Sequence, residues 1–85
     1  MKISDKLEWV IINNECMIVN CETKKNYFLN KTSTFIWNLI LNNKNLDEII
    51  NICLNSCSNI YSEDIIINDV NQCISNFKMY KILRE

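Results

Sequence analysis

The side chains that could do chemistry here are thiols and carboxylates, because the chain has five cysteines and ten Asp and Glu residues but no histidine. The cysteines are Cys16, Cys21, Cys53, Cys57 and Cys73. Zinc sites draw on closely spaced cysteine and histidine ligands, and the chain contains neither a CxxC pair nor a histidine. We therefore expect no metal site, and we interpret the thiols as small buried side chains in a reducing compartment.

The carboxylates form no recognisable catalytic set. Five of them lie at or near the starts of expected helices, where the helix dipole favours negative charge. These are Asp47, Glu48, Glu63, Asp64 and Asp69. The chain also has no glycine-rich phosphate loop, and no serine or cysteine stands beside a plausible base. This pattern predicts a protein that is not an enzyme and needs no cofactor.

The length and net charge of the chain limit the classes of function that remain. Eighty-five residues, 48% hydrophobic and 22% charged, predict one small globular domain over residues 1–85. The net charge of −1 argues against a nucleic-acid partner, which requires a basic surface. No apolar run approaches the roughly 20 residues that span a bilayer, and residues 1–6 do not resemble a signal peptide. We expect a cytoplasmic protein without a membrane partner, with residues 1–6 as a loose tail.

The first third of the chain has the composition of short β-strands. Leu7–Ile12 and Glu15–Asn20 are rich in β-branched and aromatic residues. The pair Asn13-Asn14 between them suits a tight hairpin turn, since asparagine tolerates positive φ. A polar loop then leads to a third run, Asn26–Leu29. Three strands with short connections predict an antiparallel meander.

The hydrophobic period then becomes helical, and three helices are expected. The first covers Thr32–Leu41. The second, Leu46–Cys57, has a continuous apolar face and begins at Asn45, which can form a capping box with Glu48. The third runs from about residue 63 to residue 79.

The order of these elements predicts the fold class. Strands followed by helices indicate an α+β domain in which three α-helices cover one face of a three-stranded antiparallel sheet. This arrangement is compatible with a winged helix-turn-helix. Ser62 can cap the third helix, and residues 81–83 are expected to pack back on the body as a short extended tail. Trp9 and Trp37 are expected to fill the core.

Four short segments follow one another in a fixed order between Leu7 and Leu83. They are Tyr27-Phe28-Leu29-Asn30, Ile36-Trp37-Asn38-Leu39-Ile40, Leu46-Asp47-Glu48-Ile49-Ile50, and Asp69-Val70 with Cys73, Ile74 and Phe77. In their order and spacing the chain resembles the PqqD-like family, the recognition elements for ribosomally synthesised precursor peptides. The family usually has glycine just before a closing apolar pair, whereas this chain has Lys81 before Ile82-Leu83. The geometry of that turn is therefore expected to differ.

The resemblance implies a winged helix-turn-helix that binds the leader segment of a precursor peptide and catalyses nothing. In this family the leader docks as an added strand beside the third strand, in a groove against the third helix. The leader is then presented to a modifying enzyme, often a radical SAM protein. Some members are fused to other domains, and at 85 residues this one is expected to be free-standing.

The expected peptide-binding site has two halves. The third strand offers an edge without proline, with Phe28 exposed and with Tyr27 and Leu29 turned toward the core. The third helix offers a polar stripe beside its buried face. The candidate residues are Lys25, Asn26, Tyr27, Phe28, Leu29, Asp69, Gln72, Cys73, Asn76 and Met79. Lys24 and Lys25 either attract an acidic leader or form a solvated turn, and the residues leave both open.

Two other functions remain open at this point. The main alternative is a winged-helix DNA-binding regulator, because the same fold serves many of them. Its recognition helix would need basic side chains, whereas the expected third helix carries Glu63, Asp64 and Asp69 against Lys78. The other alternative is a homodimer formed through the open strand edge, which could coexist with leader binding. The precursor peptide, its modification and the partner enzyme are not readable from the residues.

Overall fold

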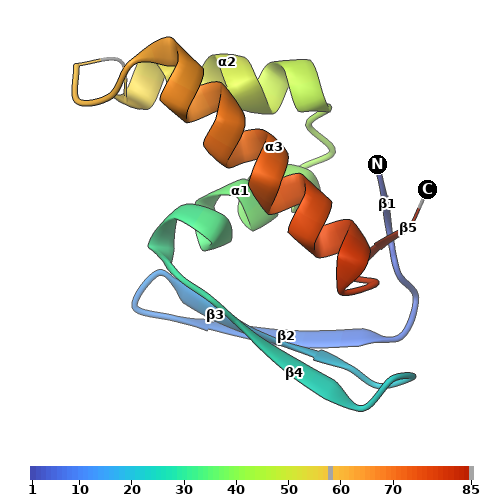
Figure 1. Cartoon of the computed structure of the whole chain (residues 1–85). Helices are drawn as coiled ribbons and strands as arrows, with labels where there is room; N and C mark the ends of the chain where they lie inside the picture. Colours follow the sequence, from blue (N-terminus) through green and yellow to red (C-terminus); the bar gives the residue numbers. More distant parts are fainter. Residues whose placement is uncertain (58, 85) are drawn as a thin grey trace.

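The computed structural model describes residues 1–57 and 59–84 (Figure 1). Its elements are, in order, β1 (Lys2–Ile3), β2 (Leu7–Ile12), β3 (Glu15–Asn20), β4 (Lys25–Leu29), α1 (Lys31–Leu41), α2 (Leu46–Cys57), α3 (Glu63–Met79) and β5 (Leu83–Arg84). The predicted α+β class is confirmed, since a three-stranded antiparallel sheet precedes three helices. The bounds predicted for the meander strands and the helices differ from those observed by at most one residue.

Asparagine takes the turn positions of the β2–β3 hairpin. Ile12 pairs with Glu15, so that Asn13 and Asn14 form a two-residue loop, and both have positive φ (53° and 63°). This backbone conformation matches the twist of the flanking strands, and asparagine adopts it more readily than most residues. The predicted turn is confirmed, and the chain makes it without glycine.

Asn20 organises the turn between β3 and β4. Its side chain is only 3% exposed, and its Oδ1 accepts hydrogen bonds from the backbone N–H groups of Glu22 and Thr23 at 3.0 and 3.1 Å. Its Nδ2 donates to the carbonyl of Lys81 at 3.3 Å. A buried amide needs such partners to offset its desolvation. Asn20 therefore joins the β3–β4 turn to the segment that follows α3.

Asparagine also begins two of the helices. The Asn30 side chain accepts a hydrogen bond from the N–H of Ser33 at the start of α1. Before α2, the N–H of Glu48 donates to Asn45 Oδ1 at 2.9 Å, and the N–H of Asn45 donates to Glu48 Oε1 at 3.0 Å, which confirms the predicted capping box. Ser62 stands at the N-cap of α3, but its side chain makes no capping hydrogen bond, so this prediction is wrong.

The three helices cover one face of the β2–β3–β4 sheet, and the core lies between the two layers (Figure 1). Trp37 is fully buried there, with its ring edge-on to Phe77 (centroids 5.9 Å apart) and to Trp9 (5.5 Å). Trp9 was expected in the core as well, yet it is 43% exposed. It lies at the border of the core because β2 is an edge strand, which leaves one side of its indole uncovered.

Residues 1–6 do not form the loose tail that was predicted. Lys2–Ile3 pairs antiparallel with Leu83–Arg84, which makes a two-stranded sheet of β1 and β5. The N–H of Ser4 donates to the carbonyl of Ile82 at 3.0 Å. The Arg84 guanidinium contacts the Asp5 carboxylate at 3.0 Å, although the two residues are 79 positions apart. The prediction failed because a two-residue strand has no readable period and its partner lies at the other end of the chain.

The segment after α3 turns back onto the body, as predicted. Ile82 and Leu83 are buried, with exposed fractions of 0% and 3%. Lys81 precedes them in the left-handed region (φ 60°), where the resemblance led us to expect glycine. This conformation costs a residue with a Cβ roughly 1–2 kcal/mol. The buried pair offsets that cost, because each large apolar side chain contributes about 1.5–3 kcal/mol when it is removed from water.

Among the described residues, no helix is both long enough and apolar enough to cross a membrane.

Candidate peptide-binding site

β4 is an edge strand with a free backbone side. Its neighbour is β3, in a register that runs from Cys16–Leu29 to Asn20–Lys25, and no other segment of the described chain pairs with it. The strand contains no proline, so each of its residues keeps its N–H. In an antiparallel ladder, successive residues direct their N–H and C=O groups to alternate sides. The side of β4 that faces away from β3 can therefore pair with a visiting extended segment.

Side chains of β4 alternate between the two faces of the sheet, as predicted. On the helix side Leu29 is buried and Tyr27 is half-buried, whereas Phe28 is 80% exposed on the outer face. Phe28 lies opposite Met17, which in turn lies opposite Val10, so an apolar row crosses the outer face. A strand added to β4 would place alternate side chains beside this row and the others beside Tyr27.

An aromatic stack connects β4 with the end of α3. The rings of Tyr27 and Tyr80 are 4.4 Å apart at their centroids and nearly parallel, at 15°. Tyr80 is the C-cap residue of α3, so the stack sets the spacing between the strand edge and this helix end. Nothing in the sequence pattern pointed to Tyr80, because a single residue beyond a helix belongs to no periodic stripe.

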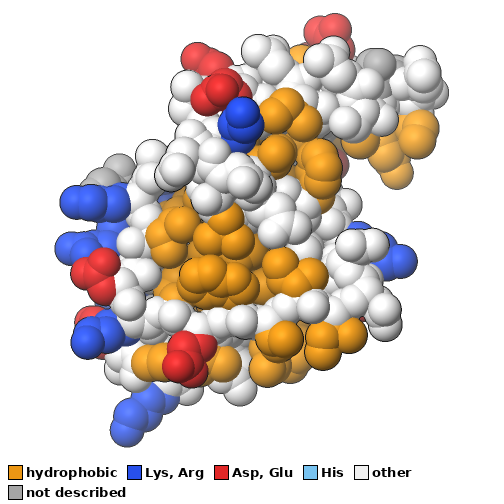
Figure 2. Space-filling model, turned by 180° about the vertical axis from the view of Figure 1, so that it is seen from behind, with side chains coloured by type: hydrophobic (Ala, Val, Ile, Leu, Met, Phe, Trp, Pro, Cys, Tyr) orange, Lys and Arg blue, Asp and Glu red, His pale blue; other side chains and the backbone are white. Residues whose placement is uncertain are grey.

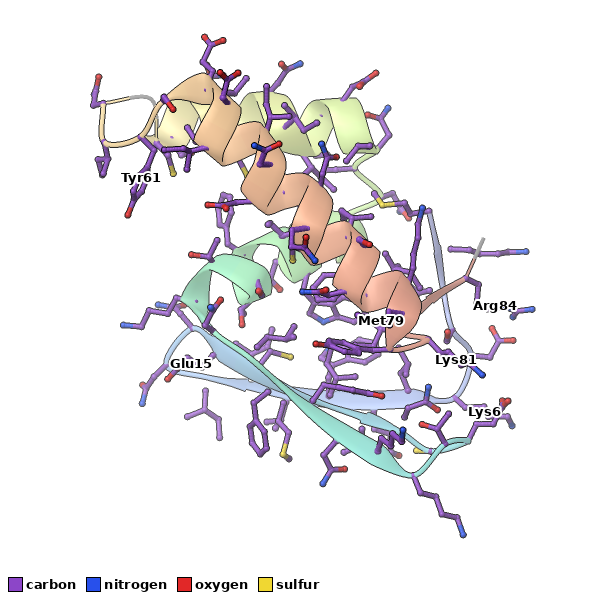
Figure 3. The ribbon with its side chains drawn as sticks, viewed as in Figure 1. Lys6, Glu15, Tyr61, Met79, Lys81 and Arg84 are labelled. Carbon is purple, nitrogen blue, oxygen red and sulfur yellow. The ribbon has the colours of Figure 1, made fainter. Side chains whose placement is uncertain are left out.

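The candidate side chains of α3 follow its helical period. Asp69 and Gln72 are exposed, and Met79 is 67% exposed at the C-terminal end of the helix (Figure 3). Asn76 is half-buried and accepts a hydrogen bond from Gln72 Nε2 at 3.0 Å. Cys73 is only 8% exposed and belongs to the core. The stripe therefore offers amide donors and acceptors, a carboxylate and a thioether, while Cys73 contributes packing beneath it.

The ten candidate residues do not form one continuous surface. Leu29 and Cys73 are core residues. Asn26 and Phe28 share the outer face of the sheet, away from the helices, because their register partners Val19 and Met17 lie on that face. The remaining six candidates are Lys25, Tyr27, Asp69, Gln72, Asn76 and Met79. These six belong to the helix-side surface of β4 or to the exposed stripe of α3, two surfaces that the stack of Tyr27 on Tyr80 connects.

A cavity of about 410 Å³ lies where α1, α2 and α3 meet, and it was not predicted. Its largely apolar lining includes Phe35, Cys57, Tyr61, Ile66 and Val70. Figure 3 shows Tyr61 on the loop that leads into α3. Lys31, which comes two residues after β4, and Asp69 also line it, so the cavity lies next to the C-terminal end of the strand edge. No sequence pattern indicated it, because Phe35 belongs to the apolar stripe of α1 and only the structure shows that it and Tyr61 are exposed.

The thiols are free, and three of them are buried as expected. Burial raises the pKa of Cys16, of Cys53 and of Cys73 above that of an ordinary thiol. Cys21 is exposed, which contradicts the expectation for it, because it falls just after β3 in the turn. Within residues 1–57 and 59–84, no three Cys, Asp or Glu side chains are grouped in a way that could hold a metal ion.

No protein-family model matches the chain, and no curated protein matches its sequence. A solved structure described as TbiB1 in complex with the TbiA(beta) leader peptide matches it with a TM-score of 0.86. The match covers 99% of this chain and 95% of that chain, at 21% sequence identity. At this identity the likeness shows a shared fold, and this is the fold that the sequence resemblance implied. The chain therefore has the fold of TbiB1 over almost its whole length.

Proposed function

We propose that this chain binds the leader segment of a ribosomally synthesised precursor peptide and presents it to a peptide-modifying enzyme. The leader pairs with the free edge of β4 as an added strand, and its inward side chains lie against α3. The chain itself supplies binding and orientation, and the enzyme supplies the chemistry.

The observation that carries the proposal is the unpaired edge of β4. Its backbone can form a ladder with any extended segment, which gives affinity without a sequence requirement. Sequence preference then comes from the side chains on either side of the ladder, which are Tyr27 and the α3 stripe on one face and Phe28 on the other. Beyond the end of the strand, the cavity at Phe35 and Tyr61 can receive an apolar side chain.

The structural neighbour provides the second support. TbiB1 has the same fold and was solved with a leader peptide bound. A fold by itself hosts many functions, so the likeness carries weight only together with the open edge of β4 in this chain. No catalytic group is required for such a role.

Charge on the helices disfavours the DNA-binding alternative. The first turn of α3 carries Glu63 and Asp64, and the first turn of α2 carries Asp47 and Glu48. A helix that enters the major groove presents its N-terminal residues to bases and phosphates. Carboxylates at both helix starts would repel the phosphate backbone.

A titration followed by amide resonances tests the proposal. The probe is the leader segment of a precursor peptide encoded beside the gene for this protein, added to the isotope-labelled chain. We expect the largest shifts at residues 25–30 and along the exposed side of α3 from Asp69 to Met79. Shifts confined to other surfaces, or no saturable binding, would contradict the proposal.

Replacing Phe28 tests whether the outer face takes part. We expect Phe28→Asp to weaken leader binding about five- to tenfold, because interface aromatics commonly contribute more than 1 kcal/mol. Its stability should change by less than about 0.5 kcal/mol, since the ring is 80% exposed. Ile12→Asp is the matched control, because Ile12 is 64% exposed on the other edge strand. Equal effects of the two variants in calorimetric titration would remove Phe28 from the site.

A further inference from the structure

Positive charge gathers at one end of the molecule. All nine Lys and Arg residues lie in the described part of the chain, and seven belong to the segments around the start of β4 and the end of α3. These seven are Lys2, Lys6, Lys24, Lys25, Lys78, Lys81 and Arg84. Figure 2 shows most of the blue side chains along one side of the surface. Asp5, Glu8 and Glu22 lie on the same segments, so this region, which we call the basic end, has a moderate excess of cations in a chain whose net charge is −1.

Hydrogen bonds hold the segments of the basic end together. The N–H of Cys21 donates to the carbonyl of Lys6 at 2.7 Å, and the N–H of Lys24 donates to the carbonyl of Asn20 at 2.7 Å. Asn20 Nδ2 reaches the carbonyl of Lys81. The turn before β4, the start of β2 and the residues after α3 are thus fixed relative to one another, although they are distant in the sequence.

A cavity of about 440 Å³ opens at this end. Three cations line it, and Figure 3 shows all three, Lys6, Lys81 and Arg84, on the same side of the molecule. Two carboxylates also line it, Asp5 and Glu22. Asp5 is held by Arg84 at 3.0 Å, whereas the side chains of Lys6 and Lys81 are exposed. The cavity therefore combines the Asp5–Arg84 ion pair with Glu22 and two lysines that face the solvent, which leaves one cation in excess.

Five of the ten Asp and Glu residues lie on α2 and α3, whereas Asp5, Glu8 and Glu22 lie on the same segments as the cations of the basic end. Asp47 and Glu48 begin α2, Glu63 and Asp64 begin α3, and Asp69 lies one to two turns further along α3. The free edge of β4 runs between the two regions. Its last residue, Leu29, leads into α1 and toward the cavity that Asp69 lines, and its first residue, Lys25, lies opposite Asn20 at the basic end. An extended ligand on this edge would meet Lys24 and Lys25 at one end and both Asp69 and Lys31 near the other, so the excess of cations lies at the end beside Lys25.

Resting on the proposed function, we infer that the bound leader carries acidic side chains just beyond the part that pairs with β4, at the end beside Lys25. Lys6, Lys24, Lys25 and Lys81 bind these carboxylates. Such exposed charge contacts speed association and set orientation more than they add affinity. A nucleic-acid phosphate backbone fits less well, because it needs a continuous basic surface and Asp5 and Glu22 interrupt this one.

A random-sequence peptide library displayed on phage tests the inference. After selection on the wild-type protein, the enriched peptides should combine an extended apolar segment with Asp or Glu on one flank. A selected acidic peptide should bind several-fold more weakly when the ionic strength rises from low salt to about 0.5 M, because exposed charge contacts are screened. Enriched peptides without a charge bias would overturn the inference and leave the proposed function intact. If no peptide is enriched at all, both the inference and the proposed function are contradicted.

Charge-reversed variants locate the contact. We expect Lys6→Glu with Lys81→Glu to weaken binding of a selected acidic peptide roughly tenfold, since each reversal replaces a weak attraction by a weak repulsion. Lys44→Glu with Asn51→Asp and Asn55→Asp is the control, because it lowers the net charge by the same four units at positions outside the basic end and outside both cavities. Thermal melting must show that both variants fold. Equal effects of the two variants, or tighter binding of duplex DNA than of any acidic peptide, would contradict the inference.

Discussion

Phe28 and Trp37 are both large aromatic residues, and their surroundings give them different roles. Trp37 is fully buried, and its Nε1 has no hydrogen-bond partner among the described residues. Its indole therefore stabilises the fold by packing in the core and not by a hydrogen bond. Phe28 is 80% exposed, and the fold gains little from it. Exposing such a ring on a strand edge is unfavourable unless a partner covers it. Trp37 is therefore a packing residue, and the exposure of Phe28 is consistent with the proposed binding role.

The buried thiols predict a loss of stability at high pH. Because burial raises the pKa values of Cys16, Cys53 and Cys73, these thiols keep their protons at a pH where the unfolded chain has lost them. The unfolded state then binds fewer protons than the folded state, so the free energy of unfolding falls as pH rises above about 8.5. Below that pH the thiols should have no effect.

Urea unfolding under reducing conditions at neutral and alkaline pH measures this loss. A Cys73→Ala variant should be less stable at pH 7, because it removes buried atoms, but its decline above pH 8.5 should be shallower. A decline as steep as that of the wild-type protein would assign the effect to the titration of other groups.

The two free strand edges of the sheet differ in chemistry. β4 is preceded by Lys24 and begins with Lys25 and Asn26, which deter pairing between identical chains. β2 carries no lysine, and its four consecutive residues Trp9–Ile12 are 38–64% exposed. Figure 2 shows apolar side chains gathered on the surface opposite to the view of Figure 1. An apolar strand edge without lysine favours pairing with the same edge of a second chain.

This difference predicts self-association through β2 rather than through β4, where the homodimer was first expected. Antiparallel pairing of β2 with a second copy about Val10 places Trp9 of each chain opposite Ile11 of the other and keeps the two Glu8 side chains apart. Sedimentation should show weak, concentration-dependent dimers that Val10→Lys abolishes while peptide binding at β4 persists. Loss of dimers in a Lys25→Glu variant, with no effect of Val10→Lys, would assign association to β4 instead.

The capping box of α2 is a local device with a measurable contribution. Asn45→Ala removes the acceptor of the Glu48 N–H and should lower the free energy of unfolding by about 1 kcal/mol. Asn55→Ala serves as the control, because Asn55 is exposed within α2 and alanine is the better helix former. The control should be neutral or slightly stabilising in urea unfolding. A loss of similar size in both variants would show that the cap contributes nothing specific.

At the scale of the whole molecule, the two ends of the chain close the fold together. β1 and β5 pair, and the N–H of Ser4 bonds the carbonyl of Ile82. Deleting residues 1–3 removes these strand hydrogen bonds and the partly buried Ile3, which should lower the free energy of unfolding by about 2 kcal/mol. Peptide binding should survive, because β4 and α3 are untouched. An unchanged urea midpoint would show that the β1–β5 sheet does not stabilise the fold.

Local patterns determined most of the elements. The two-residue asparagine turn, the capping box at Asn45 and the helical stripes of α2 and α3 involve residues within a few positions of one another, so propensity and period reveal them. The alternation along β4 likewise placed Phe28 and Leu29 on opposite faces, and the resemblance implied that Leu29 is the buried one. The binding roles of the ten candidate residues stay predictions.

Only the tertiary structure revealed the contacts between segments that are distant in the sequence. The pairing of β1 with β5, the stack of Tyr27 on Tyr80, the cavity between α1, α2 and α3 and the basic end all join residues far apart in the chain. A net charge of −1 gives no hint that Lys6, Lys81 and Arg84 line one cavity. Sequence patterns show which side of an element is apolar. Contacts between distant segments depend on how the elements pack around the whole core, and a local pattern does not contain that information.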